Sequence, residues 1–435
     1  MAEFDARVAA RDLEIGVVGL GYVGLPLALA HAEVGFRVVG FDVDAERCAA
    51  LNSGRSHIED VADGRLLAQV ELARFRAHPD ASSLQSSDVI FICVPTPYDR
   101  HQTPDLSYVR AALGSVSSVL RPGVLVILQS TTYPGTTVEV CKPILEATGL
   151  VAGVDFHLAF SPERVDPGNE QWTVATTPKV VGGITEECGR RAALLLESLM
   201  TAPGQVRQVS TPAAAEMAKL LENTYRAVNI ALVNELAQLC HRMGIDVWEV
   251  IDAAATKPFG FEAFVPGIGP GGHCIPVDPQ YLSWKAREFD FRTEFIDLAA
   301  DTNQGMADYV VGRVRAFVDR LGFALAGARV LCLGAAFKPG VADIRNSRAI
   351  RVMELLVQAG AHVEFADPRV DELDIGGARR KSVAIGAAMA DGFDVVVVLV
   401  AHPELRGLEA LAEAVPVFDA VGLLEARGHP SYERL

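Results

Sequence analysis

Short apolar runs alternate with longer amphipathic stretches along the first part of the chain. Residues 13–44, LEIGVVGLGYVGLPLALAHAEVGFRVVGFDVD, predict a strand, a glycine-rich turn, a helix and a second strand. Further apolar runs bounded by turn residues follow at Asp88–Val94, Val124–Gln129 and His157–Phe160. Short strands of this kind, separated by helical stretches, are typical of a parallel sheet covered on both faces. We therefore expect a first α/β unit that extends to about residue 205.

The pattern changes after Thr211. From Thr211 to Met243 the chain is rich in Ala and Leu and has no proline beyond Pro212. Thr211 suits an N-cap, Pro212 the first helical position and Gly244 a C-terminal stop. The segment therefore predicts one helix of roughly 30 residues, long for a globular protein. Such a helix can bridge two domains and offer a face for self-association.

The C-terminal third repeats the pattern of the first unit. ARVLCLGAAFKP predicts a strand and a glycine turn, IRVMELLVQAG a helix, and AHVEFADP a strand that ends in Asp367. The two copies align, because Gly35 precedes Asp42 by seven residues, as Gly360 precedes Asp367. The predicted class is α/β: two Rossmann-like, doubly wound parallel-sheet domains, 1–205 and 313–435, joined by a central helical domain, 206–312.

Composition and charge narrow the function. The chain has 435 residues, of which 50% are hydrophobic, and a formal net charge of −16 without a Lys/Arg-rich run, which argues against nucleic-acid or membrane binding. Seven cysteines are scattered singly, without a metal-ligand spacing, so we expect reduced thiols and no metal. The N-terminal residues lack a signal-peptide pattern. These features predict a soluble, cytoplasmic protein.

The first glycine turn has the pattern of a dinucleotide site. Gly19-x-Gly21-x-x-Gly24 lies between the predicted strand and helix, and Asp42 follows 18 residues after the third glycine. Gly19 permits a tight turn, Gly21 lets the backbone approach a pyrophosphate, and Gly24 lets helix and strand pack closely. Asp42 suits a ribose hydroxyl and disfavours a 2′-phosphate. We predict NAD as the cofactor, with Tyr22 and Val23 also at its site.

The most unusual stretch is Pro266–Asp278, PGIGPGGHCIPVD. Its glycines and prolines exclude a helix or strand before His273 and can hold the Cys274 sulfur at a defined, exposed place. A neighbouring imidazole or cation would favour the nucleophilic thiolate. The other six cysteines lie in apolar or helical contexts. Cys274 is therefore a candidate nucleophile, and a buried structural cysteine beside a turn is the alternative.

Lys219 and Asn223 lie four residues apart on the long predicted helix and so share one face. The small and apolar residues around Lys219 favour a partly buried side chain. The alternative interpretation is a surface ion pair between Lys219 and Glu216, three residues earlier.

Together, the glycine fingerprint, the Lys–Asn helix, the Cys274 loop and the second nucleotide-type unit resemble the UDP-glucose/GDP-mannose dehydrogenase family. The resemblance covers residues 12–425. Within the family, Ser161–Asn169 (SPERVDPGN) and GPGGHCIPVDPQYLSWKA look like the UDP-N-acetylglucosamine 6-dehydrogenase branch.

The resemblance implies a four-electron oxidation of a sugar C6 alcohol with two NAD⁺, through a thiohemiacetal and a thioester on Cys274. It implies that Lys219 and Asn223 stabilise the oxyanion, while Asp278 assists Lys219 or positions water. It further implies Glu163 as base for the hydrolytic water. Cofactor contacts are implied for Pro95, Thr96 and Thr131, and Thr131 can instead hold a catalytic water. Substrate contacts are implied for Arg164, Gly271, Lys338 and Arg345, the last two at the UDP end.

The chain departs from the family pattern in the C-terminal unit. Residues 338–348, KPGVADIRNSR, lack two acids and a proline of the usual motif, and Val421 replaces a common arginine. Asp343 could also be a simple surface partner of Arg345. UDP-N-acetylmannosamine and UDP-glucose therefore remain alternative substrates. Two other functions stay open: a two-electron 3-hydroxyacid-type dehydrogenase, and a non-catalytic regulator that binds nucleotide sugars.

Overall fold

The computed structural model describes residues 2–98, 103–166, 168–169, 171–385, 392–426 and 428–435, so Pro167 of the SPERVDPGN motif lies outside them. Contacts divide the chain into two units, one of Met1–Glu222 with Trp284–Phe291 and one of Asn223–Ser283 with Arg292–Leu435. Each unit contains its own sheet and its own hydrophobic core.

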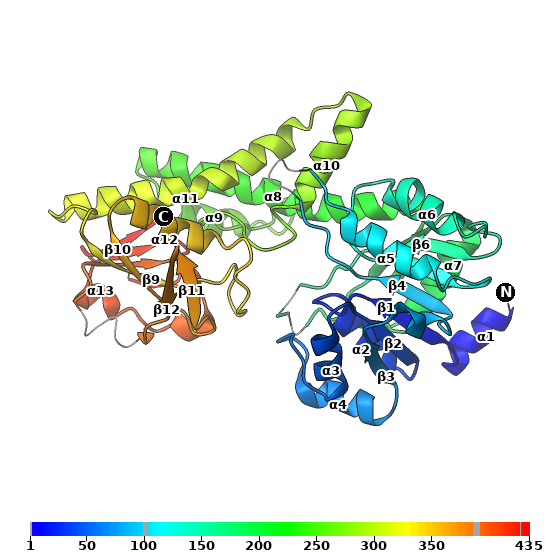
Figure 1. Ribbon diagram of the computed structural model, residues 1–435. Coiled ribbons are helices and arrows are strands. Elements are labelled where there is room, and N and C mark those ends of the chain that lie inside the picture. The colour runs from blue at the N-terminus through cyan, green and yellow to red at the C-terminus, as the bar shows by residue number, and fades with distance from the viewer. Residues whose placement is uncertain (1, 99–102, 167, 170, 386–391, 427) are drawn as a thin grey trace. The chain divides into compact units, whose positions relative to one another are not determined.

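The first unit is built on an eight-stranded sheet with strand order β3-β2-β1-β4-β5-β6-β7-β8 (Figure 1). The predicted parallel pairing is confirmed except at one place, where β7 runs antiparallel to β6. The strands are β1 Glu14–Val18, β2 Arg37–Phe41, β3 Phe75–His78, β4 Val89–Ile92, β5 Leu125–Leu128, β6 His157–Phe160, β7 Lys179–Gly183 and β8 Val206–Val209.

Two helices of the first unit, α3 Ala45–Asn52 and α7 Glu186–Glu197, begin with a side-chain N-cap. Asp44 accepts a hydrogen bond from Arg47 N, and Thr185 accepts one from Cys188 N. The other helices of this unit are α1 Ala2–Ala10, α2 Gly24–Glu33, α4 Asp63–Glu71, α5 Ser107–Ser117 and α6 Lys142–Glu146, with a 3-10 turn at Ala81–Leu84 and a π-helical turn at Thr137–Cys141.

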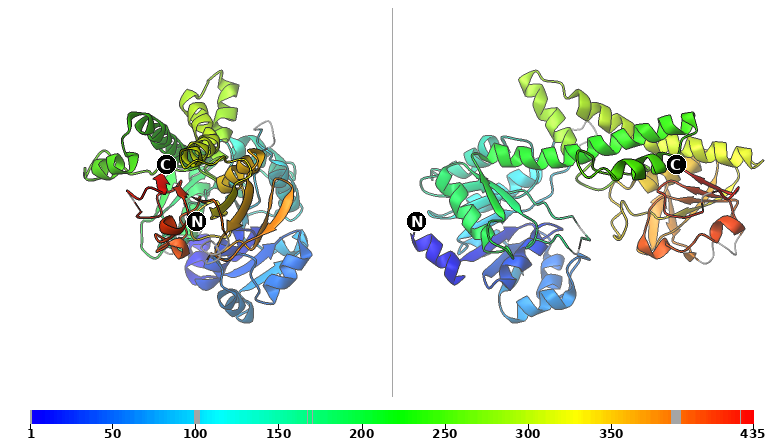
Figure 2. Two further views of the ribbon diagram at one scale, coloured as in Figure 1. Left: turned by 90° about the vertical axis from the view of Figure 1, so that its left-hand side faces the viewer. Right: turned by 180° about the vertical axis from the view of Figure 1, so that it is seen from behind.

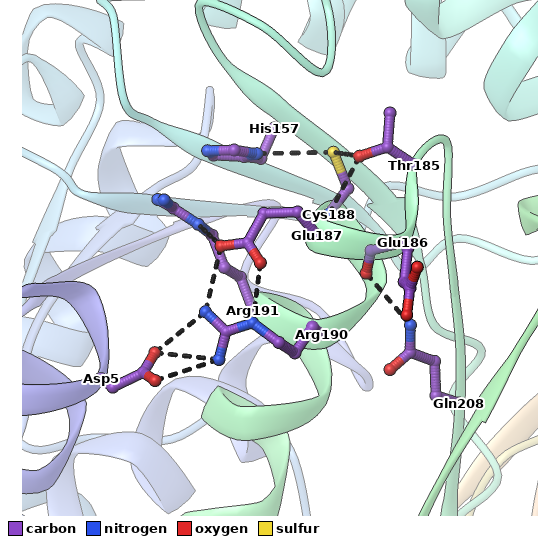
Figure 3. A network of polar contacts seen from close by, with 9 residues as sticks. All are labelled: Asp5, His157, Thr185, Glu186, Glu187, Cys188, Arg190, Arg191 and Gln208. Carbon is purple, nitrogen blue, oxygen red and sulfur yellow. Dashed lines mark hydrogen bonds and ion pairs between the residues drawn. The ribbon is translucent and has the colours of Figure 1, made fainter. Parts of the chain in front are cut away.

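Helix α1 is attached to this unit by an ion-pair network with α7 (Figure 3). Both carboxylate oxygens of Asp5 accept from the Arg190 guanidinium at 3.0–3.1 Å, and Glu187 accepts from Arg190 and Arg191. The Arg191 guanidinium also lies 5.0 Å from the centre of the Phe4 ring. The network orders the N-terminal segment against the helix that covers β6 and β7.

The long helix is confirmed as α8, Pro212–Met243. Thr211 Oγ1 accepts a hydrogen bond from Ala214 N at 3.1 Å, and Gly244 has the positive φ, +72°, of a helix stop. The backbone of α8 runs without a break from the first unit into the second.

The second unit has a five-stranded parallel sheet with strand order β10-β9-β13-β14-β15 (Figures 1 and 2). Its strands are β9 Arg329–Leu333, β10 His362–Ala366, β13 Val395–Val398, β14 Val417–Asp419 and β15 Tyr432–Arg434, with a separate hairpin of β11 Glu372–Ile375 and β12 Ala378–Lys381. The helices that follow α8 are α9 Val247–Ala255, α10 Asp278–Ala286, α11 Glu294–Arg320, α12 Arg348–Gln358 and α13 Leu411–Ala414, with 3-10 turns at Arg287–Phe289 and Pro403–Leu405. Of these, the end of α10 from Trp284 on and the turn at Arg287–Phe289 belong to the first unit.

Buried amides fasten α8 to α11 within the second unit. Asn234 Nδ2 donates to Asn303 Oδ1 at 3.0 Å, and Asn303 Nδ2 donates to the Ala227 carbonyl at 2.9 Å. Asn234 Oδ1 accepts from Gly267 N at 3.0 Å, which joins the start of the glycine-rich loop to the same pair.

In the described ranges, no helix is both long and apolar enough to cross a membrane.

Candidate active site

The turn between β1 and α2 excludes side chains at two glycines and has open space at a third. A Cβ on Gly24 would lie 1.8 Å from the Gly19 carbonyl oxygen, and Gly19 has φ +87°. A Cβ on Gly21 would have no neighbour within 4 Å. The N-terminus of α2 is therefore open to a pyrophosphate, with the Tyr22 side chain exposed and Val23 half-buried beside it. These residues fit NAD.

Asp42 lies just after β2, and its carboxylate already accepts hydrogen bonds from neighbouring protein groups. Its Oδ2 accepts from Leu20 N at 2.9 Å, and Arg47 Nη1 lies 3.0 Å from both carboxylate oxygens. The sequence interpretation missed Arg47, whose only signal is its place in the first turn of the next helix. Asp44 N also donates to Oδ1 at 3.1 Å, so the roughly four lone-pair sites of the carboxylate are filled, and a ribose hydroxyl would take the place of one of these donors. In the second unit, Asp367 accepts from Ala335 N at 2.6 Å, so the acids aligned in the sequence hold equivalent turns.

The loops after β4 and β5 are tied together. Ser130 Oγ donates to the Val94 carbonyl at 2.7 Å. This hydrogen bond joins the loop that carries Pro95 and Thr96 to the loop that carries Thr131. Thr96 is buried, Thr131 is half-buried and Pro95 is exposed. Because the carboxyl ends of parallel strands form the ligand edge of such sheets, these three residues lie on the edge where the glycine turn also lies.

Glu163 follows β6 on the same edge and is nearly buried. Its Oε2 accepts from Gln129 Nε2 at 2.8 Å, and its Oε1 accepts from the next two backbone N–H groups at 2.8 and 3.0 Å. Lys179 Nζ lies 3.6 Å from Oε1. Burial alone would raise the pKa of Glu163, but Lys179, the two N–H groups and Lys219 together lower it. Glu163 is thus held as a carboxylate.

Lys219 and Asn223 lie one turn apart on α8, and both are buried. The expectation of a buried Lys219 is confirmed, and the alternative of a surface pair with Glu216 is wrong. Glu216 is fully buried and accepts hydrogen bonds from Gly135 N at 2.6 Å and Thr137 N at 2.9 Å. The Lys219 charge acts instead on Glu163, whose pKa it helps to lower.

Arg164 points its guanidinium into two interactions of the first unit. Arg164 Nη2 lies 2.7 Å from Glu222 Oε1, and Nη1 donates to the Pro178 carbonyl at 2.7 Å. The implied substrate contact of Arg164 stays a prediction, and the side chain already has two protein partners.

The glycine-rich loop presents Cys274 at the start of α10. All seven cysteines lie in the described part of the chain, and Cys274 alone is exposed. Its carbonyl accepts from Val277 N at 3.1 Å and Asp278 N at 2.8 Å, which forms the turn that opens α10. Asp278 is buried, and its Oδ2 accepts from Asn223 Nδ2 at 2.5 Å. The second unit thus joins Cys274, Asp278 and Asn223.

The loop has no room for side chains where it meets the segment after β9. A Cβ on Gly271 would lie 2.8 Å from Asn346 O, and one on Gly272 would lie 2.7 Å from the Phe337 ring. Gly272 N donates to the Arg345 carbonyl at 3.2 Å, and Asn346 Nδ2 donates to Gly272 O at 3.1 Å. The cysteine loop is therefore seated on the segment that carries Lys338 and Arg345.

Arg345, Lys338 and His273 lie in or beside the segment on which the cysteine loop is seated. The Arg345 guanidinium is held by Asp343 at 2.6–3.0 Å, as the alternative interpretation had it, and the Lys338 ammonium lies 5.8 Å from the centre of the Phe337 ring. Burial, followed by the Arg345 charge, lowers the pKa of His273. The imidazole next to Cys274 is therefore neutral at pH 7 and is not the cation that would favour a thiolate.

Three family models match the chain in succession. The NAD binding domain of the UDP-glucose/GDP-mannose dehydrogenase family matches residues 13–200, its central domain residues 213–305 and its UDP binding domain residues 331–426.

Relatives match over nearly the whole chain. A UDP-N-acetyl-D-glucosamine 6-dehydrogenase of Pseudomonas aeruginosa is 39% identical over 402 residues, 92% of this chain and 93% of the relative. A UDP-N-acetyl-D-mannosamine dehydrogenase of Pyrococcus horikoshii is 36% identical over 401 residues, 91% of each chain. The solved UDP-D-ManNAc dehydrogenase of Pyrococcus horikoshii has a TM-score of 0.88 at 34% identity, over 97% of this chain and 99% of that one. The chain therefore belongs to the UDP-glucose/GDP-mannose dehydrogenase family and is an NAD-dependent enzyme.

Proposed function

We propose that the enzyme oxidises the C6 alcohol of UDP-N-acetylglucosamine to the carboxylate with two NAD⁺, through covalent intermediates on Cys274. The observation that carries this proposal is the exposed Cys274 thiol at the start of α10, backed by the buried Asn223–Asp278 hydrogen bond. A two-electron alcohol dehydrogenase needs no thiol, whereas a four-electron oxidation needs a nucleophile that retains the aldehyde.

When bound, NAD⁺ supplies a hydride acceptor for each of the two oxidations. Between them, the Cys274 sulfur adds to the C6 aldehyde carbon to give a thiohemiacetal, whose oxidation leaves a thioester. Water then attacks the thioester carbonyl, the C–S bond breaks, and Cys274 leaves as a thiol with the carboxylate product. Overall, one alcohol, one water and two NAD⁺ give one carboxylate, two NADH and three protons.

The buried polar residues suit separate parts of this sequence. The Lys219 ammonium and the Asn223 amide donate to the oxygen that becomes negative, and Asp278 orients Asn223. Glu163, held by backbone N–H groups, accepts a hydrogen bond or a proton from the hydrolytic water, and Thr131 contacts the cofactor or that water. Arg164 and Gly271 contact the sugar nucleotide.

The substrate assignment rests on the UDP binding domain and on the names of the relatives. Lys338 and Arg345 are the cations that we assign to the UDP end of the substrate, in a chain with a net charge of −16. The relative from Pseudomonas aeruginosa is named for the gluco sugar and the one from Pyrococcus horikoshii for its C2 epimer. UDP-N-acetylmannosamine is therefore the second candidate.

The exposed apolar side chains of α8 suggest where copies of the enzyme associate. Side chains at one face of α8 are exposed and apolar, namely Tyr225, Leu232, Leu236, Leu239 and Met243. Their i, i+4, i+7 spacing makes a stripe that suits a homodimer or larger homo-oligomer through this helix.

We also propose the three-domain division 1–205, 206–312 and 313–435, and a cytoplasmic location in keeping with seven free thiols.

The test is the stoichiometry of NADH. Purified enzyme is incubated with NAD⁺ and, separately, with UDP-N-acetylglucosamine, its C2 epimer and UDP-glucose, and NADH is counted per sugar consumed. We expect two NADH per sugar, with the highest kcat/KM for UDP-N-acetylglucosamine. Cys274→Ala should abolish the second NADH, whereas Cys240→Ala, at a buried thiol on α8, should retain it. One NADH per sugar in the unaltered enzyme, or none with any sugar, contradicts the mechanism.

A further inference from the structure

Lys179, the first residue of β7, has a fully buried side chain. Its exposed fraction is 1%, and its Nζ has no hydrogen-bond partner among the described residues. Lysine is almost never buried to this degree unless its charge is paired, because removal of an ammonium from water costs several kcal/mol. The buried Lys179 ammonium therefore needs a nearby negative charge that offsets the cost of its desolvation.

That partner is Glu163. Lys179 Nζ lies 3.6 Å from Glu163 Oε1, and the Glu163 side chain is 12% exposed, so water screens the pair weakly. At this distance Lys179 acts mainly as a charge, while the hydrogen bonds that aim the carboxylate come from Gln129 Nε2 and two backbone N–H groups.

The other charged and titratable groups that face Glu163 come from neighbouring elements. Lys219 on α8 adds a second, weaker positive charge, and the buried Cys93 thiol after β4 has a pKa raised by burial and by Glu163 itself. A neutral thiol cannot balance the carboxylate. Lys179 is thus the dominant cation at Glu163, ahead of the lysine that the sequence interpretation assigned to the site.

We propose that Lys179 is a positioning residue for thioester hydrolysis: it pairs with Glu163 and holds that carboxylate charged and fixed for the attacking water. The inference rests on the proposed function, since it gives Lys179 a part in the hydrolytic step. It separates the two lysines by task, with Lys219 assigned to the oxyanion of the sugar and Lys179 to the carboxylate that meets water.

The experiment compares Lys179→Met, which removes the charge at similar volume, with Lys179→Arg, which retains it. Lys142→Met is the matched control, because Lys142 is a half-buried lysine of the same unit whose Nζ lies 3.9 Å from Glu146 Oε1, away from Glu163. Each variant is assayed for the initial burst of NADH, for steady-state kcat between pH 5 and 9, and for acylated enzyme by intact-protein mass spectrometry.

For Lys179→Met we expect an unchanged burst, a kcat lower by about tenfold to hundredfold at pH 7, accumulated acyl-enzyme, and an acidic limb of the pH profile moved to higher pH. Lys179→Arg should restore the position of the acidic limb. Lys142→Met should match the unaltered enzyme. A Lys179→Met variant with an unmoved acidic limb and no acyl-enzyme overturns the proposal, as do Met and Arg variants that are equally impaired.

A second measurement needs neither turnover nor a Lys179 variant. The side-chain carboxyl carbon of Glu163 is followed by NMR in ¹³C-glutamate-labelled protein, with its signal identified by comparison with Glu163→Gln. A midpoint below the ordinary range of glutamate supports the pairing, and a midpoint within or above that range overturns it. If the unaltered enzyme oxidises no UDP-sugar, the proposed function fails while this titration still tests the ion pair.

Discussion

At the scale of single residues, the cofactor turn depends on which glycines face atoms and which face open space. A methyl group at Gly24 would overlap the Gly19 carbonyl, whereas one at Gly21 would meet no protein atom. The first position therefore serves packing, and the second serves the ligand. Substitution by alanine separates these two purposes within one motif.

We expect Gly24→Ala to lower the free energy of unfolding by about 2 kcal/mol, because the helix must move away from the strand. Gly21→Ala should leave the thermal midpoint unchanged and weaken NAD⁺ binding by tenfold or more, since its methyl group occupies the path of the pyrophosphate. Calorimetry of unfolding and of NAD⁺ binding measures both. Gly114→Ala, in open space on α5, is the control and should stabilise by about 1 kcal/mol. Equal effects of the first two variants on stability would contradict this division.

At the scale of elements, α2 is buried against the sheet with one titratable ring on its buried side. His31 is fully buried, its ring centre lies 5.1 Å from that of Phe91, and its Nδ1 lies 3.0 Å from the Leu27 carbonyl oxygen. Burial, with help from Lys179 and Arg11, lowers the pKa of His31 to about 4. The packing of helix on sheet is therefore sensitive to acid.

The direction of the change in stability with pH follows from the protonation of His31 in the folded and unfolded protein. The unfolded chain gains a proton near pH 6.5 while the folded protein resists it to about pH 4, so stability present at neutral pH is lost as pH falls through this window. We expect His31 to contribute a loss of about 2 kcal/mol between pH 7 and pH 5. Urea denaturation at both pH values should show this loss in the unaltered protein and in His362→Gln, an exposed control. It should be smaller in His31→Gln, and an equal loss there would refute the assignment.

Local patterns made the elements beside the two glycine turns, three further strands and the long helix predictable. The runs at 88–94, 124–129 and 157–160 became β4, β5 and β6, and Thr211 and Gly244 bounded α8 within a residue. The reversed direction of β7 was not predictable, because direction depends on pairing between distant segments. Lys179 at Glu163 was missed for the same reason, because the sheet brings the start of β7 to the residues that follow β6. Arg47 lies only five residues after Asp42, and its ion pair with Asp42 depends on the turn from β2 into α3.

At the scale of the whole molecule, the two largest sheets of the described residues lie in different units with separate cores, and so do the predicted ligand sites. The NAD binding match ends at residue 200, and the UDP binding match begins at residue 331. The three tryptophans are distributed to report on this: Trp172 and Trp284 belong to the first unit and Trp248 to the second.

We expect NAD⁺ at one hundred times its Kd to stabilise the first unit by about 2.7 kcal/mol, because it binds that folded unit alone. Thermal unfolding followed by fluorescence in Trp248→Phe reports this unit. The double variant Trp172→Phe/Trp284→Phe reports the second unit, whose transition should respond to UDP and not to NAD⁺. Identical shifts of both transitions by either ligand would show that the units unfold as one.

The unbroken helix α8 has a consequence for how this sequence can diverge. Lys219 and Asn223 are separated by one helical turn, so their spacing is fixed by backbone hydrogen bonds and not by the side chains between them. Substitutions at the exposed Leu221 leave that spacing intact. Insertion or deletion of a single residue there rotates one group by about 100° away from the other. Descendants of this chain can therefore vary Leu221, but the length of this turn is inherited unchanged.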